Sequence, residues 1–138
     1  MANQIQITFD AANPPAQAEF WALALGYVLQ PPPPGFDSWE AFADANDIPP
    51  ERRGDFGAAV DPDGNGPRLL FLKVPEGKTA KNRMHLDVVA ADPAAHIEAL
   101  VAAGATKIED HEEFGTSWTV MNDPEGNEFC VAGEHPDG

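Results

Sequence analysis

The chain has 138 residues, 43% of them hydrophobic, and a formal net charge of −15 from 8 Lys and Arg against 23 Asp and Glu. This length and composition predict one folded domain with a buried core. The negative charge argues against binding to nucleic acids or anionic membranes, which depends on clustered Lys and Arg. No apolar run reaches the ~18 residues of a membrane span, and residues 1–9 lack the pattern of a signal peptide. A single cysteine, Cys130, forms no internal disulfide, which indicates a cytoplasmic protein.

The first predicted elements are a strand and a helix. Over residues 5–9, apolar Ile5, Ile7 and Phe9 alternate with polar residues, which is the period of a half-buried strand. Asn13 then serves as the N-cap of a helix, followed by two prolines that suit a first helical turn. Gly26 is expected to end this helix. The alternation predicts that Ile5, Ile7 and Phe9 pack against the helix.

Residues 30–55 are expected to form an insertion. They begin with four consecutive prolines, which are stiff and cannot donate backbone hydrogen bonds to a central strand. Ser38 is predicted to cap a short helix from Trp39 to Asn46, before a Pro-Pro pair. A long excursion of this kind forms either a lid or rim beside a site, or packing over an edge strand.

The strand and helix pattern returns in the second half. Met84, Leu86 and Val88 alternate with other residues and are expected in the core. Asp92 begins a helix as its N-cap, and Gly104 ends it. The spacing from strand to helix cap is the same in both halves, so the sequence predicts a repeated unit.

A repeated turn supports the same conclusion. The sequence Asp-Pro-Asp-Gly-Asn at residues 61–65 matches Asp-Pro-Glu-Gly-Asn at residues 123–127. Pro followed by Gly favours a tight turn. Each copy lies between strand-like segments, at residues 56–60 and 69–74 in the first half and 117–121 and 128–131 in the second.

The segments NPPAQAEFWALALGY, RMHLDVVAADPAAHIEALVAAGA and WTVMNDPEGNEFCV resemble the vicinal oxygen chelate superfamily, in particular its glyoxalase-like and bleomycin-resistance branch. The resemblance implies an α+β fold of two tandem βαβββ modules that form a curved eight-stranded mixed sheet. Ligand or metal would lie in its concave side, here called the cup. One glyoxalase-like domain, residues 1–138, would hold module 1 at about 3–75, with its insertion at 30–55, and module 2 at about 83–132. Relatives commonly dimerise, so a homodimer is one alternative to a monomer.

In this family, metal ligands lie on the first and last strands of each module. Gln6 and His85 match two of these places, and Cys130 stands where a glutamate is usual. The fourth place falls on Leu70 or Leu72, which cannot bind a metal. The resemblance therefore leaves two alternatives: a Zn, Ni, Mn or Fe site of Gln6, His85 and Cys130, with Glu128 as a displaced substitute for Cys130, or a cup without a metal.

The first functional expectation is a protein that binds a small organic molecule in the cup without a complete metal site. The alternative is a metal-dependent lyase or isomerase of the glyoxalase type, acting on a carbonyl or glutathione-adduct substrate with Glu128 as the base. Whether the chain is an enzyme stays open at this stage. The expected ligand-binding residues are Thr8, Trp39, Leu70, Leu72, His85, Trp118, Glu128 and Cys130.

Overall fold

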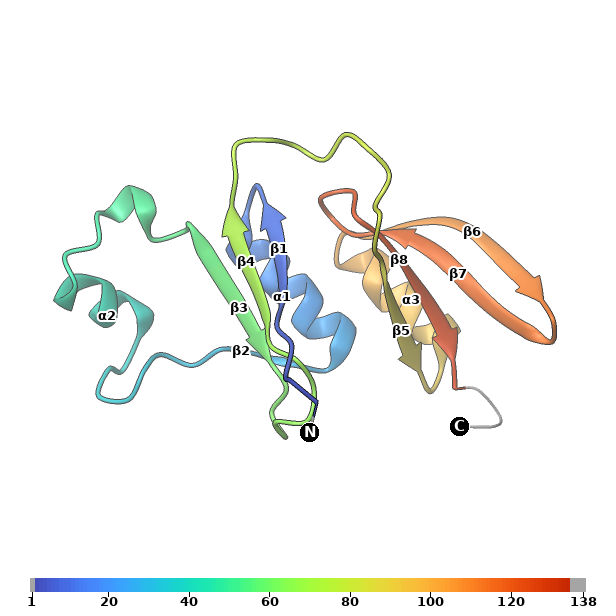
Figure 1. Cartoon of the computed structure of the whole chain (residues 1–138), viewed down its shortest axis with the longest axis horizontal. Helices are drawn as coiled ribbons and strands as arrows, with labels where there is room; N and C mark the ends of the chain where they lie inside the picture. The colour runs from blue at the N-terminus through green and yellow to red at the C-terminus, as the bar shows by residue number, and fades with distance from the viewer. Residues whose placement is uncertain (1, 135–138) are drawn as a thin grey trace. The chain divides into compact units, whose positions relative to one another are not determined.

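A computed structural model of the chain describes residues 2–134. The chain divides into two compact units, Met1–Gly77 and Lys78–Gly138, and the boundary falls between the two predicted modules. Both units contain four strands with a helix after the first strand (Figure 1). Within the described residues, no helix is long and apolar enough to cross a membrane.

The first unit is a four-stranded sheet with strand order β1-β4-β3-β2. β1 and β4 are parallel, whereas the other neighbours are antiparallel. Helix α1 packs against β3 and β4, and α2 belongs to the insertion. The elements are β1 (Ile7–Ala11), α1 (Pro14–Leu25), β2 (Val28–Leu29), α2 (Trp39–Ala45), a 3₁₀ turn (Pro50–Arg52), β3 (Phe56–Val60) and β4 (Leu69–Lys73).

The second unit repeats this topology, with strand order β5-β8-β7-β6 and one parallel pair, β5 and β8. Its elements are β5 (Leu86–Ala90), α3 (Pro93–Ala102), β6 (Thr106–Glu113), β7 (Thr116–Asn122) and β8 (Glu128–Gly133). The predicted α+β class with two βαβββ modules is therefore confirmed. Hydrogen bonding in the described residues divides the eight strands into two sheets of four.

Both long helices begin as the sequence predicts. The side chain of Asn13 accepts a hydrogen bond from Ala16 N at 3.3 Å, and that of Asp92 accepts one from Ala95 N at 3.2 Å. Each cap satisfies an amide that the first turn of a helix leaves without an intrahelical partner. Gly26 ends α1 in the left-handed region at φ 70°, which a glycine adopts without a Cβ clash.

The two repeated turns are organised by their aspartates. Asp61 accepts hydrogen bonds from Asp63 N, Asn65 N and Gly66 N at 2.7–3.1 Å. Asp123 accepts bonds from Glu125 N and Asn127 N at 2.9 and 3.0 Å. Each carboxylate therefore stabilises its own turn, and each turn connects two antiparallel strands.

Each sheet buries its helix-facing side. In the first unit, Trp21 of α1 is buried and lies 5.3 Å from Phe9 between ring centroids. In the second unit, Leu100 of α3, Phe129 and Val131 are buried. Alternation along each strand therefore turns the remaining side chains to the opposite side of each sheet, where in the first unit the ring of Trp39 from α2 packs against Phe56.

The prediction that Ile5 and Met84 lie in the core is wrong. Ile5 is 71% exposed and Met84 is 85% exposed. β1 begins at Ile7 and β5 begins at Leu86, so both residues precede the strands whose alternation they were assigned to. The period of two was correct, but it was extended two residues too far toward the N-terminus in both units.

Candidate functional site

The side of the second sheet that faces away from α3 carries four of the predicted site residues, His85, Trp118, Glu128 and Cys130. Strand register places Asp87, Cys130 and Val120 side by side across β5, β8 and β7. The neighbouring row contains Val89, Ala132 and Trp118. We call this side the second open face, and its residues are His85, Asp87, Val89, His111, Trp118, Val120, Glu128, Cys130 and Ala132.

His85, Asp87 and Cys130 form a polar cluster on this face. His85 Nε2 lies 3.2 Å from Asp87 Oδ1, and the ligand atoms of all three residues lie within 4.8 Å of one another. Burial raises the pKa of the Cys130 thiol, and the charge of Asp87 and a hydrogen bond to it raise it further, although Lys81 lowers it. Without a metal ion, the thiol is therefore protonated at neutral pH.

The same cluster has the chemistry of a transition-metal site. Imidazole, carboxylate and thiolate are all zinc ligands, and three protein ligands with one open position are typical of catalytic zinc. Ligand atoms on one tetrahedral zinc ion lie roughly 3.5 Å apart, so modest rotation of the exposed His85 and Asp87 side chains would suffice. The residues therefore fit a metal ion, with Asp87 as a ligand that the sequence analysis did not include.

The third predicted metal ligand, Gln6, belongs to the first unit. Its Oε1 atom accepts a hydrogen bond from Arg68 Nη1 at 2.9 Å, and its Nε2 atom donates to Thr8 Oγ1 at 3.5 Å. An amide binds a metal ion through its oxygen, which Arg68 engages here. Gln6 stays a predicted ligand, and its present contacts are those of a surface hydrogen-bond network.

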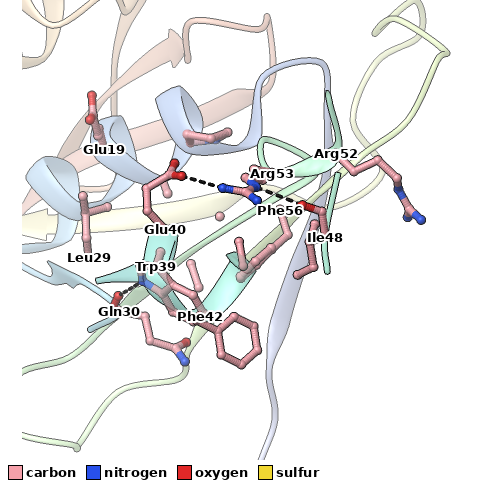
Figure 2. A pocket seen from close by; sticks show the side chains of 15 residues that line it. Glu19, Leu29, Gln30, Trp39, Glu40, Phe42, Ile48, Arg52, Arg53 and Phe56 are labelled. Carbon is pink, nitrogen blue, oxygen red and sulfur yellow. Dashed lines mark hydrogen bonds and ion pairs between the residues drawn. The ribbon is translucent and has the colours of Figure 1, made fainter. Parts of the chain in front are cut away.

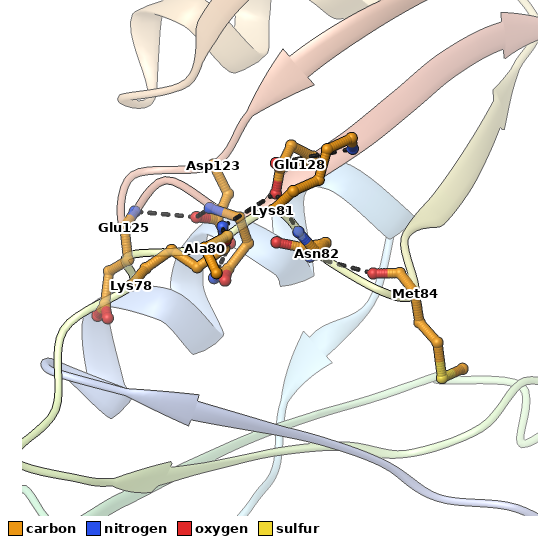
Figure 3. A network of polar contacts seen from close by, with 9 residues as sticks. Lys78, Ala80, Lys81, Asn82, Met84, Asp123, Glu125 and Glu128 are labelled. Atoms are coloured by element: carbon orange, nitrogen blue, oxygen red, sulfur yellow. Dashed lines mark hydrogen bonds and ion pairs between the residues drawn. The ribbon is translucent and has the colours of Figure 1, made fainter.

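Glu128, the predicted base, lies in an ion-pair network at the start of β8 (Figure 3). Its carboxylate is 3.2 Å from Lys78 Nζ and 3.7 Å from Lys81 Nζ, and it accepts a hydrogen bond from Asn82 N at 3.2 Å. Burial raises the pKa of Glu128, but the backbone hydrogen bonds and Lys78 outweigh it, so the pKa lies below its usual range. The carboxylate is therefore ionised and a weaker base than a free glutamate.

Trp118 lies on the second open face beside a histidine. The rings of Trp118 and His111 stack with centroids 5.4 Å apart and an interplanar angle of 14°. His111 Nε2 in turn lies 2.6 Å from Glu109 Oε1. This arrangement gives the face a flat aromatic surface bordered by polar groups.

The first sheet has an open face of its own, which we call the first open face. Register places Thr8, Leu70 and Ala58 in one row, and Asp10, Leu72 and Phe56 in the next. Thr8 and Leu72 are exposed, and Leu70 is half-buried. The face combines apolar side chains with a hydroxyl and a carboxylate.

Trp39 lies in a different setting, beside a cavity of about 290 Å³ within the first unit (Figure 2). Its indole Nε1 donates a hydrogen bond to Gln30 O at 2.9 Å, and its ring packs edge-to-face against Phe42 and Phe56. The cavity lies between α1, β3 and the insertion. The alternation of the strands could not predict this cavity, because most of its wall comes from the irregular insertion.

A model of the glyoxalase-like domain matches residues 6–132 of the chain. No match was found among curated protein sequences. Among solved structures, the bleomycin-binding protein of Streptomyces verticillus with copper(II)-bleomycin is 17% identical, with a TM-score of 0.57 over 98% of both chains.

Two further solved structures are similar over nearly their whole length. A glyoxalase/bleomycin resistance protein/dioxygenase superfamily member from Sphaerobacter thermophilus is 18% identical, with a TM-score of 0.61 over 97% of this chain and 98% of that chain. A glyoxalase-related enzyme from Fulvimarina pelagi is 19% identical, with a TM-score of 0.60 over 96% of this chain and 89% of that chain. At these identities the solved structures establish the fold alone. The family model covers nearly the whole sequence, and the chain therefore belongs to the glyoxalase-like domain family, within the vicinal oxygen chelate superfamily.

Proposed function

We propose that this chain binds a small organic molecule and that the second open face supplies its main contacts. The observation that carries the proposal is the juxtaposition of the His85, Asp87 and Cys130 cluster with apolar Val89 and Val120 on one sheet face. Small-molecule sites are mostly apolar, with a few polar groups that fix the orientation of the ligand. The similar fold of the bleomycin-binding protein supports the proposal, since that protein was solved with a small-molecule complex.

The chemistry of the face indicates the kind of ligand. Asp87 offers a carboxylate acceptor, and the stacked Trp118 and His111 rings offer a flat surface. A flat molecule that carries a hydroxyl or amino donor matches both features. The ion pairs of Glu128 lower its basicity, which favours a binding role of this face over proton transfer by Glu128.

The test is a screen of aromatic hydroxyl and amino compounds for a rise in melting temperature, followed by calorimetric titration of each compound found. Asp87→Asn should weaken binding about 10-fold or more, because a hydrogen bond to a charged group is worth about 1.5–3 kcal/mol. The control is Asp110→Asn, which changes a carboxylate of nearly equal exposure, 65% against 67%. Asp110 bonds to the buried Thr119 on the other side of the sheet. Equal affinity of wild type and Asp87→Asn would contradict the proposed site.

A metal-dependent lyase or isomerase of the glyoxalase type is the second candidate, and the distances within the His85, Asp87 and Cys130 cluster favour it. A bound divalent ion would act as a Lewis acid that polarises a substrate carbonyl. His85, Asp87 and Cys130 would hold the ion, and Glu128 remains the predicted base. The predicted cup, the cytoplasmic location and the homodimer likewise stay predictions.

Metal analysis distinguishes the two candidates. Protein purified without chelator should hold about one equivalent of Zn, Ni, Mn or Fe if the second candidate is correct, and His85→Ala and Cys130→Ala should both lose it. His96→Ala, on α3, is the control and should retain the metal. No bound metal, and no heat of binding on titration with zinc chloride, would exclude the second candidate. Glu128→Gln should retain metal but lose turnover if Glu128 is the base.

A further inference from the structure

The cavity beside Trp39 lies within the first unit and shares no residue with the second open face. Its wall contains three aromatic side chains, Trp39, Phe42 and Phe56, together with the aliphatic Leu29 and Ile48 (Figure 2). Its volume of about 290 Å³ is close to the lower end of the range for small-molecule pockets. The cavity is therefore large enough for a ligand with two or three aromatic rings.

The cavity exists because β2 stops early. β2 pairs with β3 only through Val28 and Leu29, and the last bond is from Gln30 N to Ala58 O at 3.0 Å. The four prolines that follow cannot donate further bonds, so the chain leaves the edge of β3. Residues 30–55 then return to this edge as α2 and the 3₁₀ turn (Figure 1).

The beginning of β3, which does not pair with β2, supplies backbone polar groups to the cavity. Asp55 O accepts a hydrogen bond from Lys73 N at 2.9 Å, so the backbone of Asp55 points toward β4. In an antiparallel ladder the next residue points its N–H and C=O the opposite way. The backbone groups of Phe56 therefore point away from β4, on the side where the cavity lies.

The walls of the cavity are held in place. Arg53 is only 22% exposed, donates to Ile48 O at 3.0 Å, and forms ion pairs with Glu40 at 2.7 Å and Asp44 at 2.9 Å. These bonds connect α2 to the segment that follows it, while Trp39 is bonded to Gln30 O. A wall fixed in this way cannot collapse into the cavity, and a rigid site reduces the entropy cost of binding.

The charges around the cavity argue against an anionic ligand. Arg53 is paired with Glu40 and Asp44, and Arg52 with Asp55 at 3.0 Å, so both lining arginines already have acidic partners. The protein as a whole is strongly negative. The aromatic side chains instead favour contact with flat rings.

From these observations we propose that the cavity beside Trp39 is a second binding site, which takes an uncharged, flat aromatic molecule. The rings of the ligand contact Trp39, Phe42 and Phe56, and a polar substituent bonds to the backbone of Phe56 at the edge of β3. The proposed site lies in the first unit, so this proposal can be tested independently of the function proposed for the second open face.

The test uses two fluorescent probes that share one aromatic framework, N-phenyl-1-naphthylamine, which is neutral, and 8-anilino-1-naphthalenesulfonate, which carries a sulfonate. The neutral probe should bind with saturable fluorescence enhancement, and the anionic probe should bind at least about 10-fold more weakly. Equal or tighter binding of the anionic probe, or no saturable binding of the neutral probe, would overturn the proposal.

Variants then locate the bound probe. Trp39→Ala should weaken binding of the neutral probe about 10-fold through loss of ring contact. Leu29→Trp, at a lining position that is 49% exposed, should do the same by filling the cavity without removing any existing contact of Trp39. Phe114→Ala, at a position that is 95% exposed between β6 and β7, should leave binding unchanged, and circular dichroism should show that each variant is folded. Unchanged binding in a folded Leu29→Trp variant, or loss of binding in Phe114→Ala, would place the probe elsewhere and refute the proposal.

Discussion

The two units share an order of elements, a Pro-containing helix start and an aspartate-closed turn, but they bury very different amounts of their helices. α1 buries a broad side that includes Phe20 and Trp21, whereas α3 buries Leu100 alone. β6 is exposed along nearly its whole length. Local capping and turn residues thus determine the topology in both halves, while the chemistry of each surface has diverged. The first unit has an apolar cavity, and the second has a polar sheet face.

The deeper core of the first unit predicts the largest effect on stability. Trp21→Ala should lower the free energy of unfolding by about 3–5 kcal/mol, because it leaves a large void beside Phe9. Leu23→Ala is the matched control on the same helix, at a position that is 48% exposed, and should cost much less. Urea unfolding followed by circular dichroism measures both. Similar losses for the two variants would contradict the burial difference described for α1.

A contact found only in the first unit predicts the next largest effect. A Cβ added at Gly57 of β3 would lie 2.6 Å from the carbonyl oxygen of Pro14 at the start of α1. Gly57→Ala should therefore destabilise the protein by about 1–3 kcal/mol, the usual cost of overpacking. Gly54→Ala is the control, since nothing lies within 4 Å of the added atom. A Gly57→Ala variant as stable as Gly54→Ala in urea would show that α1 does not approach β3 this closely.

The shared helix caps predict an effect that is equal in the two units. Asn13→Ala and Asp92→Ala each remove one hydrogen bond to a first-turn amide, at 3.3 and 3.2 Å. Each substitution should cost about 1 kcal/mol in urea unfolding. A loss confined to one of the two variants would mean that the repeated sequence does not stabilise both helices alike.

Much of the fold was predictable because caps and turns are local. β3 was predicted at its observed bounds, and both helix starts follow from Asn13 and Asp92. β2 and β6 were not predicted from the residues themselves. β2 has only two residues, and β6 is a largely polar strand without alternation, so its pairing with β7 determines it. Pairing across a sheet involves residues that are distant in the sequence, so the residues of a single strand predict it poorly.

The candidate sites were predictable only in part, for a related reason. The family resemblance gave His85 and Cys130 as candidate ligands, but the contact of Asp87 with Cys130 depends on the register of β5 against β8. Within the insertion, the helix from Trp39 was predicted from its Ser38 cap. The cavity itself was not, because its wall combines side chains of α1, β3 and the insertion, which only the folded chain brings together.

The smallest predicted effect concerns acid stability and the turn that Asp61 closes. Hydrogen bonds from the amides of Asp63, Gly66 and Asn65 outweigh burial and lower the pKa of Asp61 below its usual value of 3.8. The folded state therefore favours the ionised carboxylate of Asp61. The resulting stabilisation of the fold is complete above the pKa that Asp61 has in the unfolded chain. It is lost as the pH falls through the lower pKa that Asp61 has in the folded chain. Asp61→Asn should therefore lower the free energy of unfolding at pH 7. It should also make the loss of stability on acidification below about pH 4 smaller than in the wild type.

The matched control is Asp63→Asn, which removes one negative charge from the same turn but retains the amide that donates to Asp61. Urea midpoints measured from pH 7 down to pH 3 should run parallel for Asp63→Asn and wild type, whereas Asp61→Asn should converge with them at the acid end. Parallel curves for all three proteins would show that Asp61 titrates alike in the folded and unfolded chain. The hydrogen bonds of this turn would then add no acid sensitivity, and the turn would act through its Pro and Gly residues alone.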